Sequence, residues 1–144
     1  MADTDNAILN NNLFFLSGAL SRKLSNEADE VFATVGLSSS HALLMLLIHQ
    51  NPGIRPSSLA EKLHLKPSTI TRLVDKLERR QLVEKETEGR ATSIACTNEG
   101  DELSTVIKEK WNQLLQDKQE NLGERYVEVL SEMIANAIDT LPEG

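Results

Sequence analysis

Residues 67–77 combine an apolar stripe with side chains that can hydrogen-bond to DNA bases. The apolar positions follow the i, i+3, i+4, i+7 spacing of one helix face and are Ile70, Leu73, Val74 and Leu77. The polar residues that fall off this stripe are Ser68, Thr69, Thr71 and Arg72. Serine and threonine hydroxyls can contact base edges, and an arginine guanidinium can bind both acceptors of a guanine. Alone, this segment fits either a DNA-reading helix or an ordinary amphipathic surface helix with a solvated polar face.

The segments around residues 67–77 favour the DNA-reading interpretation. A helix is predicted over Pro56–Leu63, and only three residues separate it from a second helix that begins at Pro67. A short turn between two short helices is typical of helix-turn-helix units. Downstream, residues 82–83 and 93–95 can pair as an antiparallel ribbon with residues 88–90 at its tip, where Gly89 can adopt positive φ. This order of elements predicts a winged helix-turn-helix.

Helical periodicity predicts four further helices. After a frayed start at residues 1–7, one helix covers about residues 6–32, and the next follows the serines at 38–40 and ends near Gln50. The latter is apolar nearly all round, so we expect it to be buried. Thr97 caps a long helix, and a break at residues 121–123 separates it from a last helix over residues 124–141. The first and last helices carry apolar faces that need partners.

Three segments carry a likeness to a known family: SSLAEKL, PSTITRLVDKLERRQLVEK and EGRATSIACTNEG. In these segments and in the order of its helices, nearly the whole chain resembles the MarR family of bacterial transcriptional regulators. The resemblance implies a mainly α (α+β) fold in one domain, residues 1–144. Residues 37–97 would form the DNA-binding lobe with its small β-hairpin wing, and residues 1–32 and 98–144 would form the dimerisation helices.

The DNA-binding hypothesis assigns roles to particular residues. The residues expected to read base edges are Ser68, Thr69, Thr71 and Arg72. Those expected to contact the DNA backbone are Arg55, Ser57, Ser58, Lys66, Lys76 and Arg90, with Arg90 at or in the minor groove. Effector pockets in the family lie between the two lobes, and the candidates by position are Phe15, Arg22, His41, Met45 and Trp111.

The helix-turn-helix departs from the family pattern at three positions. Arg55 and Lys66 stand where small capping residues usually precede the two helices, and His64 replaces the glycine often found in the turn. One interpretation is that caps are optional here. The other is that bound phosphates satisfy the N–H groups at both helix starts, with the basic side chains assisting.

The charge of the chain is unevenly distributed. The net charge is −7, which is unusual for a DNA-binding protein, but residues 55–90 contain nine Lys/Arg and six Asp/Glu. That segment has a balance of +3, which leaves −10 on the rest of the chain. A basic reading surface on an acidic body fits this asymmetry.

Several functional classes are disfavoured by the sequence. The chain contains no run of about 18 consecutive apolar residues, so the sequence predicts no membrane span. Its acidic, polar start does not have the pattern of a secretory signal. A lone cysteine, Cys96, fits a reducing cytoplasm and a small apolar role on a strand. No enzyme, nucleotide or cofactor motif occurs, so we expect neither catalysis nor a cofactor. We expect no metal site, because His41 and His49 lie eight residues apart and the long fifth helix of the family order contains no histidine.

The resulting functional prediction is a dimeric repressor that binds double-stranded DNA at a pseudo-palindromic operator and is released by a small-molecule effector. The alternative is a winged-helix domain used for protein–protein contact without DNA binding, which the overall acidity and the short wing would suit. Salt-sensitive binding to duplex DNA separates the two.

Overall fold

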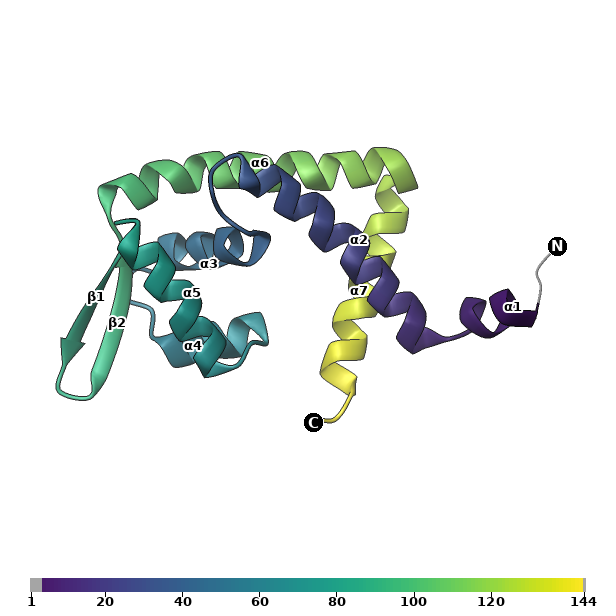
Figure 1. The fold of residues 1–144 in the computed structure, drawn as a ribbon, viewed down its shortest axis with the longest axis horizontal. Coiled ribbons are helices and arrows are strands. Elements are labelled where there is room, and N and C mark those ends of the chain that lie inside the picture. The colour runs from purple at the N-terminus through teal and green to yellow at the C-terminus, as the bar shows by residue number, and fades with distance from the viewer. Residues whose placement is uncertain (1–3, 144) are drawn as a thin grey trace. The chain divides into compact units, whose positions relative to one another are not determined.

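A computed structural model describes residues 4–143 as seven helices and a two-stranded hairpin (Figure 1). By their internal contacts the residues form two compact units, 1–107 and 108–144, which we call the first and the second unit. Within the described residues, no helix is both long and apolar enough to cross a membrane. The predicted division into a DNA-binding lobe and dimerisation helices stays a prediction.

The core of the first unit is built around helix α3, Ser39–Gln50. Ser38 caps it by accepting a hydrogen bond from the His41 N–H at 3.2 Å. Four of its side chains have no more than trace exposure: Ala42, Leu44, Met45 and Ile48. Helix α3 packs against α2 (Leu13–Ala33), α4 (Pro56–Leu63), α5 (Pro67–Arg79) and strand β2 (Ala91–Cys96). The prediction of a buried helix is confirmed, with Leu43 as an exposed exception.

Both helices of the helix-turn-helix begin where the sequence predicts, and the first also ends at the predicted residue, Leu63. Both α4 and α5 start with a proline, and the residues before them, Arg55 and Lys66, are extended. His64 ends α4 in the left-handed conformation, with φ of +54°. The Leu65 N–H then donates to the Ala60 carbonyl at 3.0 Å and closes the turn. A histidine therefore occupies the backbone conformation that a glycine would adopt most readily.

The wing is longer than predicted. Strand β1, Val83–Glu88, pairs antiparallel with β2 over its full length, from Val83 opposite Cys96 to Glu88 opposite Ala91. Gly89 at the tip has φ of +61°, as the tight turn requires. A single bridge between Ile54 and Ile94 ties the wing to the segment before α4.

The prediction of one N-terminal helix over residues 6–32 is wrong. Two helices occur instead, α1 (Thr4–Asn10) and α2, with a break at residues 11–12 (Figure 1). The Asn12 side chain caps α2 by accepting from the Phe15 N–H at 2.9 Å. Of the start predicted as frayed, residues 4–7 are helical, and residues 1–3 lie outside the described residues.

Helix α6, Asn98–Leu122, begins after Thr97, whose Oγ1 accepts from the Gly100 N–H at 3.1 Å. The second unit holds the later part of α6 and helix α7, Glu124–Thr140. Gly123, with φ of +107°, separates the two helices as predicted. No residue of α7 is buried, although its sequence has a clear apolar stripe.

Candidate nucleic-acid interface

Helix α5 has one buried apolar face and one exposed polar face. Ile70, Leu73, Val74 and Leu77 are all buried. Ser68, Thr71 and Arg72 are exposed, and Thr69 is half-buried. All four predicted base-reading residues therefore lie off the packed face of the helix. The structure does not contain DNA, and their role as base readers stays a prediction.

The polar side chains of α5 differ in how free they are to bind DNA. Within residues 4–143, Arg72 has neither a hydrogen bond nor an ion pair, so its guanidinium donors are available. Thr71 donates its hydroxyl to the Pro67 carbonyl at 3.0 Å, which leaves its oxygen as an acceptor only. Among these residues, Arg72 is the one best able to donate to a base edge.

The starts of α4 and α5 lack side-chain caps. Neither Arg55 nor Lys66 makes a capping hydrogen bond. Ser57 and Ser58 lie in the first turn of α4, and Ser68 and Thr69 lie in the first turn of α5. N–H groups at an uncapped helix start are a favourable site for an anion such as phosphate. Exposed Arg55 and Lys66 stand beside these two sites.

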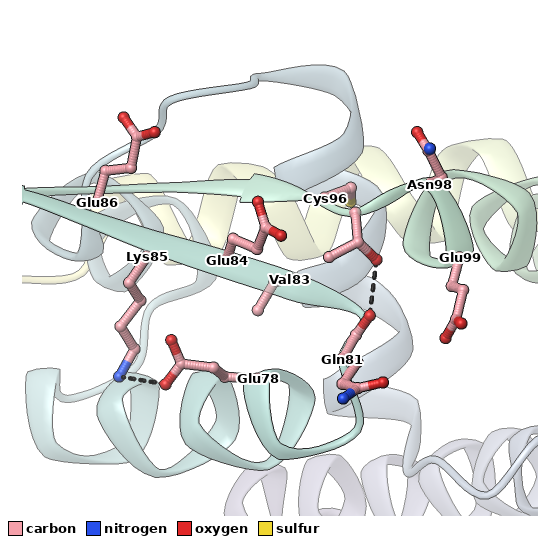
Figure 2. A pocket seen from close by; sticks show the side chains of 10 residues that line it. Glu78, Gln81, Val83, Glu84, Lys85, Glu86, Cys96, Asn98 and Glu99 are labelled. Carbon is pink, nitrogen blue, oxygen red and sulfur yellow. Dashed lines mark hydrogen bonds and ion pairs between the residues drawn. The ribbon is translucent and has the colours of Figure 1, made fainter.

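Ion pairs that were not predicted from the sequence connect the wing to α5. Lys85 of β1 lies 2.5 Å from the Asp75 carboxylate and 3.5 Å from that of Glu78, and the contact with Glu78 is drawn in Figure 2. The hydrogen bond from Lys85 to Asp75 raises the pKa of the Lys85 ammonium, and the charge of Glu78 adds to the effect. Lys85 therefore positions the wing, and the exposed cation left at its tip is Arg90.

The C-terminal end of α5 is held by a second contact that the sequence did not reveal. The Arg80 guanidinium donates to the carbonyls of Val35 and Gly36, at 3.2 and 2.9 Å. Burial lowers the pKa of nearby His41, and the charges of Lys76 and Arg80 lower it further. Lys76, predicted to bind the DNA backbone, is half-buried on this side of α5.

The comparison with known proteins identifies the family of this chain. Residues 37–88 match the model of the MarR family. A Bacillus subtilis (strain 168) protein named as the uncharacterized HTH-type transcriptional regulator YhbI is 34% identical over 107 residues, which are 72% of this chain and 70% of that protein. The chain belongs to the MarR family. It is a DNA-binding transcriptional regulator of the winged helix-turn-helix class.

Solved structures share the fold of this MarR-family chain. CouR from Rhodococcus jostii RHA1 bound to p-coumaroyl-CoA is similar with a TM-score of 0.81 and 24% identity, over 94% of this chain and 98% of that one. A DNA complex of MepR from S. aureus is similar with a TM-score of 0.80 and 18% identity, over 90% and 98%. These likenesses confirm the predicted mainly helical fold with a small hairpin.

The residues predicted to line an effector pocket are not equally accessible. Met45 is fully buried, and His41 is buried with its Nδ1 2.6 Å from the Ser38 hydroxyl. Phe15 and Arg22 are exposed on α2, and Trp111 belongs to the second unit. Their assignment to an effector stays a prediction.

Two surface pockets flank the wing, and the sequence analysis anticipated neither. One, of about 340 Å³, lies between α5 and the hairpin and includes Thr71, Lys85 and Thr92. The other, of about 880 Å³, lies beside the base of the wing (Figure 2). Its lining contains four carboxylates, those of Glu78, Glu84, Glu86 and Glu99, and one cation, Lys85. An acidic pocket of this kind disfavours DNA phosphate and favours cations.

Proposed function

We propose that this MarR-family regulator acts in the cytoplasm as a homodimeric repressor of a pseudo-palindromic operator. Each protomer would place α5 in a major groove, so that the two half-sites lie about one helical turn apart. A two-fold symmetric dimer requires a two-fold related operator, because the same surface of each protomer must meet the same bases.

The observation that carries this proposal is the exposed polar face of α5, with an Arg72 that no described protein group binds. The planar guanidinium of an arginine can donate to both the O6 and the N7 of a guanine. A protein-binding face would favour aromatic or aliphatic anchors at these positions, and none occurs among the exposed residues of α5.

Phosphate contacts would orient α5 on the duplex. The uncapped starts of α4 and α5 can each receive a phosphate oxygen, with Arg55 and Lys66 supplying positive charge. Arg90 at the wing tip would reach the minor groove, where negative potential attracts arginine. Contacts of this kind give affinity without sequence information.

The apolar residues left exposed on the terminal helices support a dimer. On α7, Met133, Ile134 and Ile138 are 65%, 44% and 49% exposed. On α2, Leu13 and Phe14 are 75% and 89% exposed. Apolar side chains exposed in such numbers mark interaction surfaces. A second copy of the chain would bury them.

An effector would act by shifting the population of two dimer arrangements. CouR, a structural relative, is bound to p-coumaroyl-CoA, and we propose that a small molecule also regulates this chain. To relieve repression, the molecule must bind the DNA-incompetent arrangement more tightly than the DNA-bound one. A hundredfold loss of DNA affinity requires a coupling of about 2.7 kcal/mol.

Fluorescence-anisotropy titrations of the full chain on the duplex upstream of its own gene would test the proposal. Each titration is run at two salt concentrations, with a shuffled duplex as competitor. Arg72→Ala is compared with Arg125→Ala, which removes the same charge from an exposed site on α7. We expect salt-sensitive binding of two protomers per duplex, weakened about 5- to 150-fold by Arg72→Ala.

Arg125→Ala should bind the duplex as the native chain does. Absence of binding to either duplex at low salt, or equal losses in the two variants, would contradict the reading role of α5.

A further inference from the structure

Three metal-binding side chains meet where the wing joins helix α6. His49 lies in the last turn of α3, Cys96 is the last residue of β2, and Asp101 lies in the first turn of α6. The His49 Nδ1, the Cys96 Sγ and an Asp101 carboxylate oxygen all lie within 4.8 Å of one another. All three residues belong to the first unit.

We propose that His49, Cys96 and Asp101 form a binding site for a divalent transition-metal ion of the Zn²⁺ type. A thiolate, an imidazole and a carboxylate are the three protein ligands that Zn²⁺ uses. The soft thiolate disfavours Mg²⁺ and Ca²⁺, which prefer oxygen ligands. Three protein ligands leave a fourth tetrahedral position for water, as in open zinc sites.

The donor atoms lie close enough together for small side-chain movements to bring them onto one ion. With metal–ligand bonds of about 2.0–2.3 Å, two tetrahedral ligands lie about 3.4 Å apart. His49 Nδ1 and Asp101 Oδ1 are now hydrogen-bonded at 2.8 Å, so they would separate slightly to admit the ion. Their side chains are 42% and 52% exposed, which gives them room to rotate.

The proton balance of binding is simple. Cys96 binds as the thiolate, so its proton leaves to solvent as the metal–sulfur bond forms. His49 offers the Nδ1 lone pair, and the ring proton is then carried on Nε2. Asp101 binds through a carboxylate oxygen. No oxidant or reductant takes part.

The surroundings of Cys96 favour a cation. Cys96 lines the acidic pocket beside the wing, together with Glu84, Glu86 and Glu99 (Figure 2). Lys85, the cation of that pocket, is already paired with Asp75 and Glu78. The pocket therefore attracts positive charge to the side from which Cys96 is reached.

A bound ion would cross-link the end of α3, the base of the wing and the start of α6. Hydrogen bonds already connect the base of the wing to the start of α6. Thr97 donates to the Gln81 carbonyl at 2.7 Å and accepts from the Gly100 N–H. An ion that binds only the folded chain stabilises it by mass action. Thermal unfolding thus provides a readout that does not depend on DNA binding.

The test uses the full chain after removal of metal with a chelator. Zn²⁺ affinity is measured by competition with a chromophoric chelator, and Co²⁺ serves as a probe because a Co²⁺–thiolate bond absorbs in the near ultraviolet. The ligand variants are Cys96→Ser, His49→Gln and Asp101→Asn. The matched controls are Glu102→Gln and His64→Asn, since asparagine tolerates the left-handed backbone at that position.

We expect one Zn²⁺ per chain, a Co²⁺–thiolate absorption, and a higher unfolding temperature with Zn²⁺. Cys96→Ser should remove the absorption, and each ligand variant should weaken Zn²⁺ binding at least about tenfold. The controls should bind like the native chain. Absence of stoichiometric binding, absence of the thiolate absorption in the native chain, or native affinity in His49→Gln and Asp101→Asn would overturn the proposal, even if Cys96→Ser fails to fold.

Discussion

At the scale of single residues, the polar face of α5 carries some side chains that make structural contacts and others that are free for the proposed contact with DNA. Asp75 holds the wing through Lys85, and Thr71 donates within its own helix. Arg72 has no partner among the described residues. Helical periodicity alone cannot make this distinction, because Lys85 reaches Asp75 from another element. Residue type and spacing identified the face, and the contacts show which of its side chains are already bound within the chain.

Lys66→Ser separates the two interpretations of the uncapped α5. Serine is a good N-cap, so the free energy of unfolding should rise by about 0.5–2 kcal/mol. The same change removes a cation beside a proposed phosphate site. DNA affinity should therefore fall on every sequence, and the slope of log K against log salt should decrease by about one.

Urea unfolding and salt titrations measure both effects of Lys66→Ser, with Lys108→Ser as the control for charge. If the affinity and the salt slope of Lys66→Ser match those of the native chain, no phosphate binds at this helix start.

The buried His41 makes stability depend on pH. Its pKa is lowered from 6.5, first by burial and then by the charges of Lys76 and Arg80. The unfolded chain therefore binds this proton more readily than the folded chain does. The contribution of the neutral His41 to stability is therefore fully present above pH 6.5, and it is lost as the pH falls below that value.

Urea unfolding at about pH 7.5 and about pH 5.5 measures this effect of His41. The native chain should lose more stability on acidification than His41→Gln does. An equal or smaller loss in the native chain would refute this role, because the other titratable groups are the same in both proteins.

Residues that meet only in the folded chain were beyond sequence analysis. His49 and Asp101 are separated by 52 residues, yet they hydrogen-bond. The absence of an i, i+4 histidine pair argued against a metal site, but that argument covers ligands on one helix only. The proposed site draws one ligand from each of three elements.

At the scale of elements, the sequence predicted best where local signals were strong. Prolines at the first helical positions mark the starts of α4 and α5, and their packed faces follow the apolar spacing. The N-terminal prediction failed because the apolar stripe continues across residues 11–12, where Asn12 starts a new helix. The outer wing was underestimated because its exposed residues lack an apolar alternation.

The joint between the wing and α6 should be intolerant of added volume at Gly100. A Cβ there would lie 2.0 Å from the Leu82 carbonyl oxygen, which is backbone and cannot rotate away. We expect Gly100→Ala to lower the free energy of unfolding by about 3 kcal/mol or more. Gly18→Ala is the matched control, because its Cβ would meet only the flexible Arg22 side chain at 3.2 Å.

Gly18→Ala lies inside α2, so it should raise stability by about 0.5–1 kcal/mol. Chemical denaturation of the two variants measures both changes. Equal stability of Gly100→Ala and the native chain would show that Leu82 does not constrain this joint.

At the scale of the whole molecule, two features stand out: the uneven distribution of charge and the exposed apolar stripe of α7. The net charge is −7, and the segment 55–90 is locally basic. This arrangement would concentrate attraction for DNA on the proposed reading surface and limit indiscriminate binding elsewhere. The apolar stripe of α7 has no buried member in one chain. Sequence periodicity identified the stripe but could not say whether its partner lies in the same chain.

Dimerisation through α7 is tested by placing a charge on its stripe. Ile138 is 49% exposed, so Ile138→Glu should leave the first unit folded. Burying that carboxylate in a dimer interface would be costly, and the variant should sediment as a monomer at concentrations where the native chain is a dimer. Asn136→Glu adds the same charge off the stripe and should remain dimeric. A native chain that sediments as a monomer would refute the dimer.

The most direct test of the central claim pairs Arg72 with a base. Affinities of the native chain and of Arg72→Ala are measured on the operator and on duplexes with each half-site base pair changed in turn. If α5 reads the major groove, substitution of one guanine should weaken the binding free energy of the native chain by about 1–3 kcal/mol. The same substitution should leave the binding free energy of Arg72→Ala almost unchanged. Arg72→Ala could instead bind all duplexes more weakly but lose the same affinity as the native chain at each substituted base pair. That result would show that Arg72 does not read sequence.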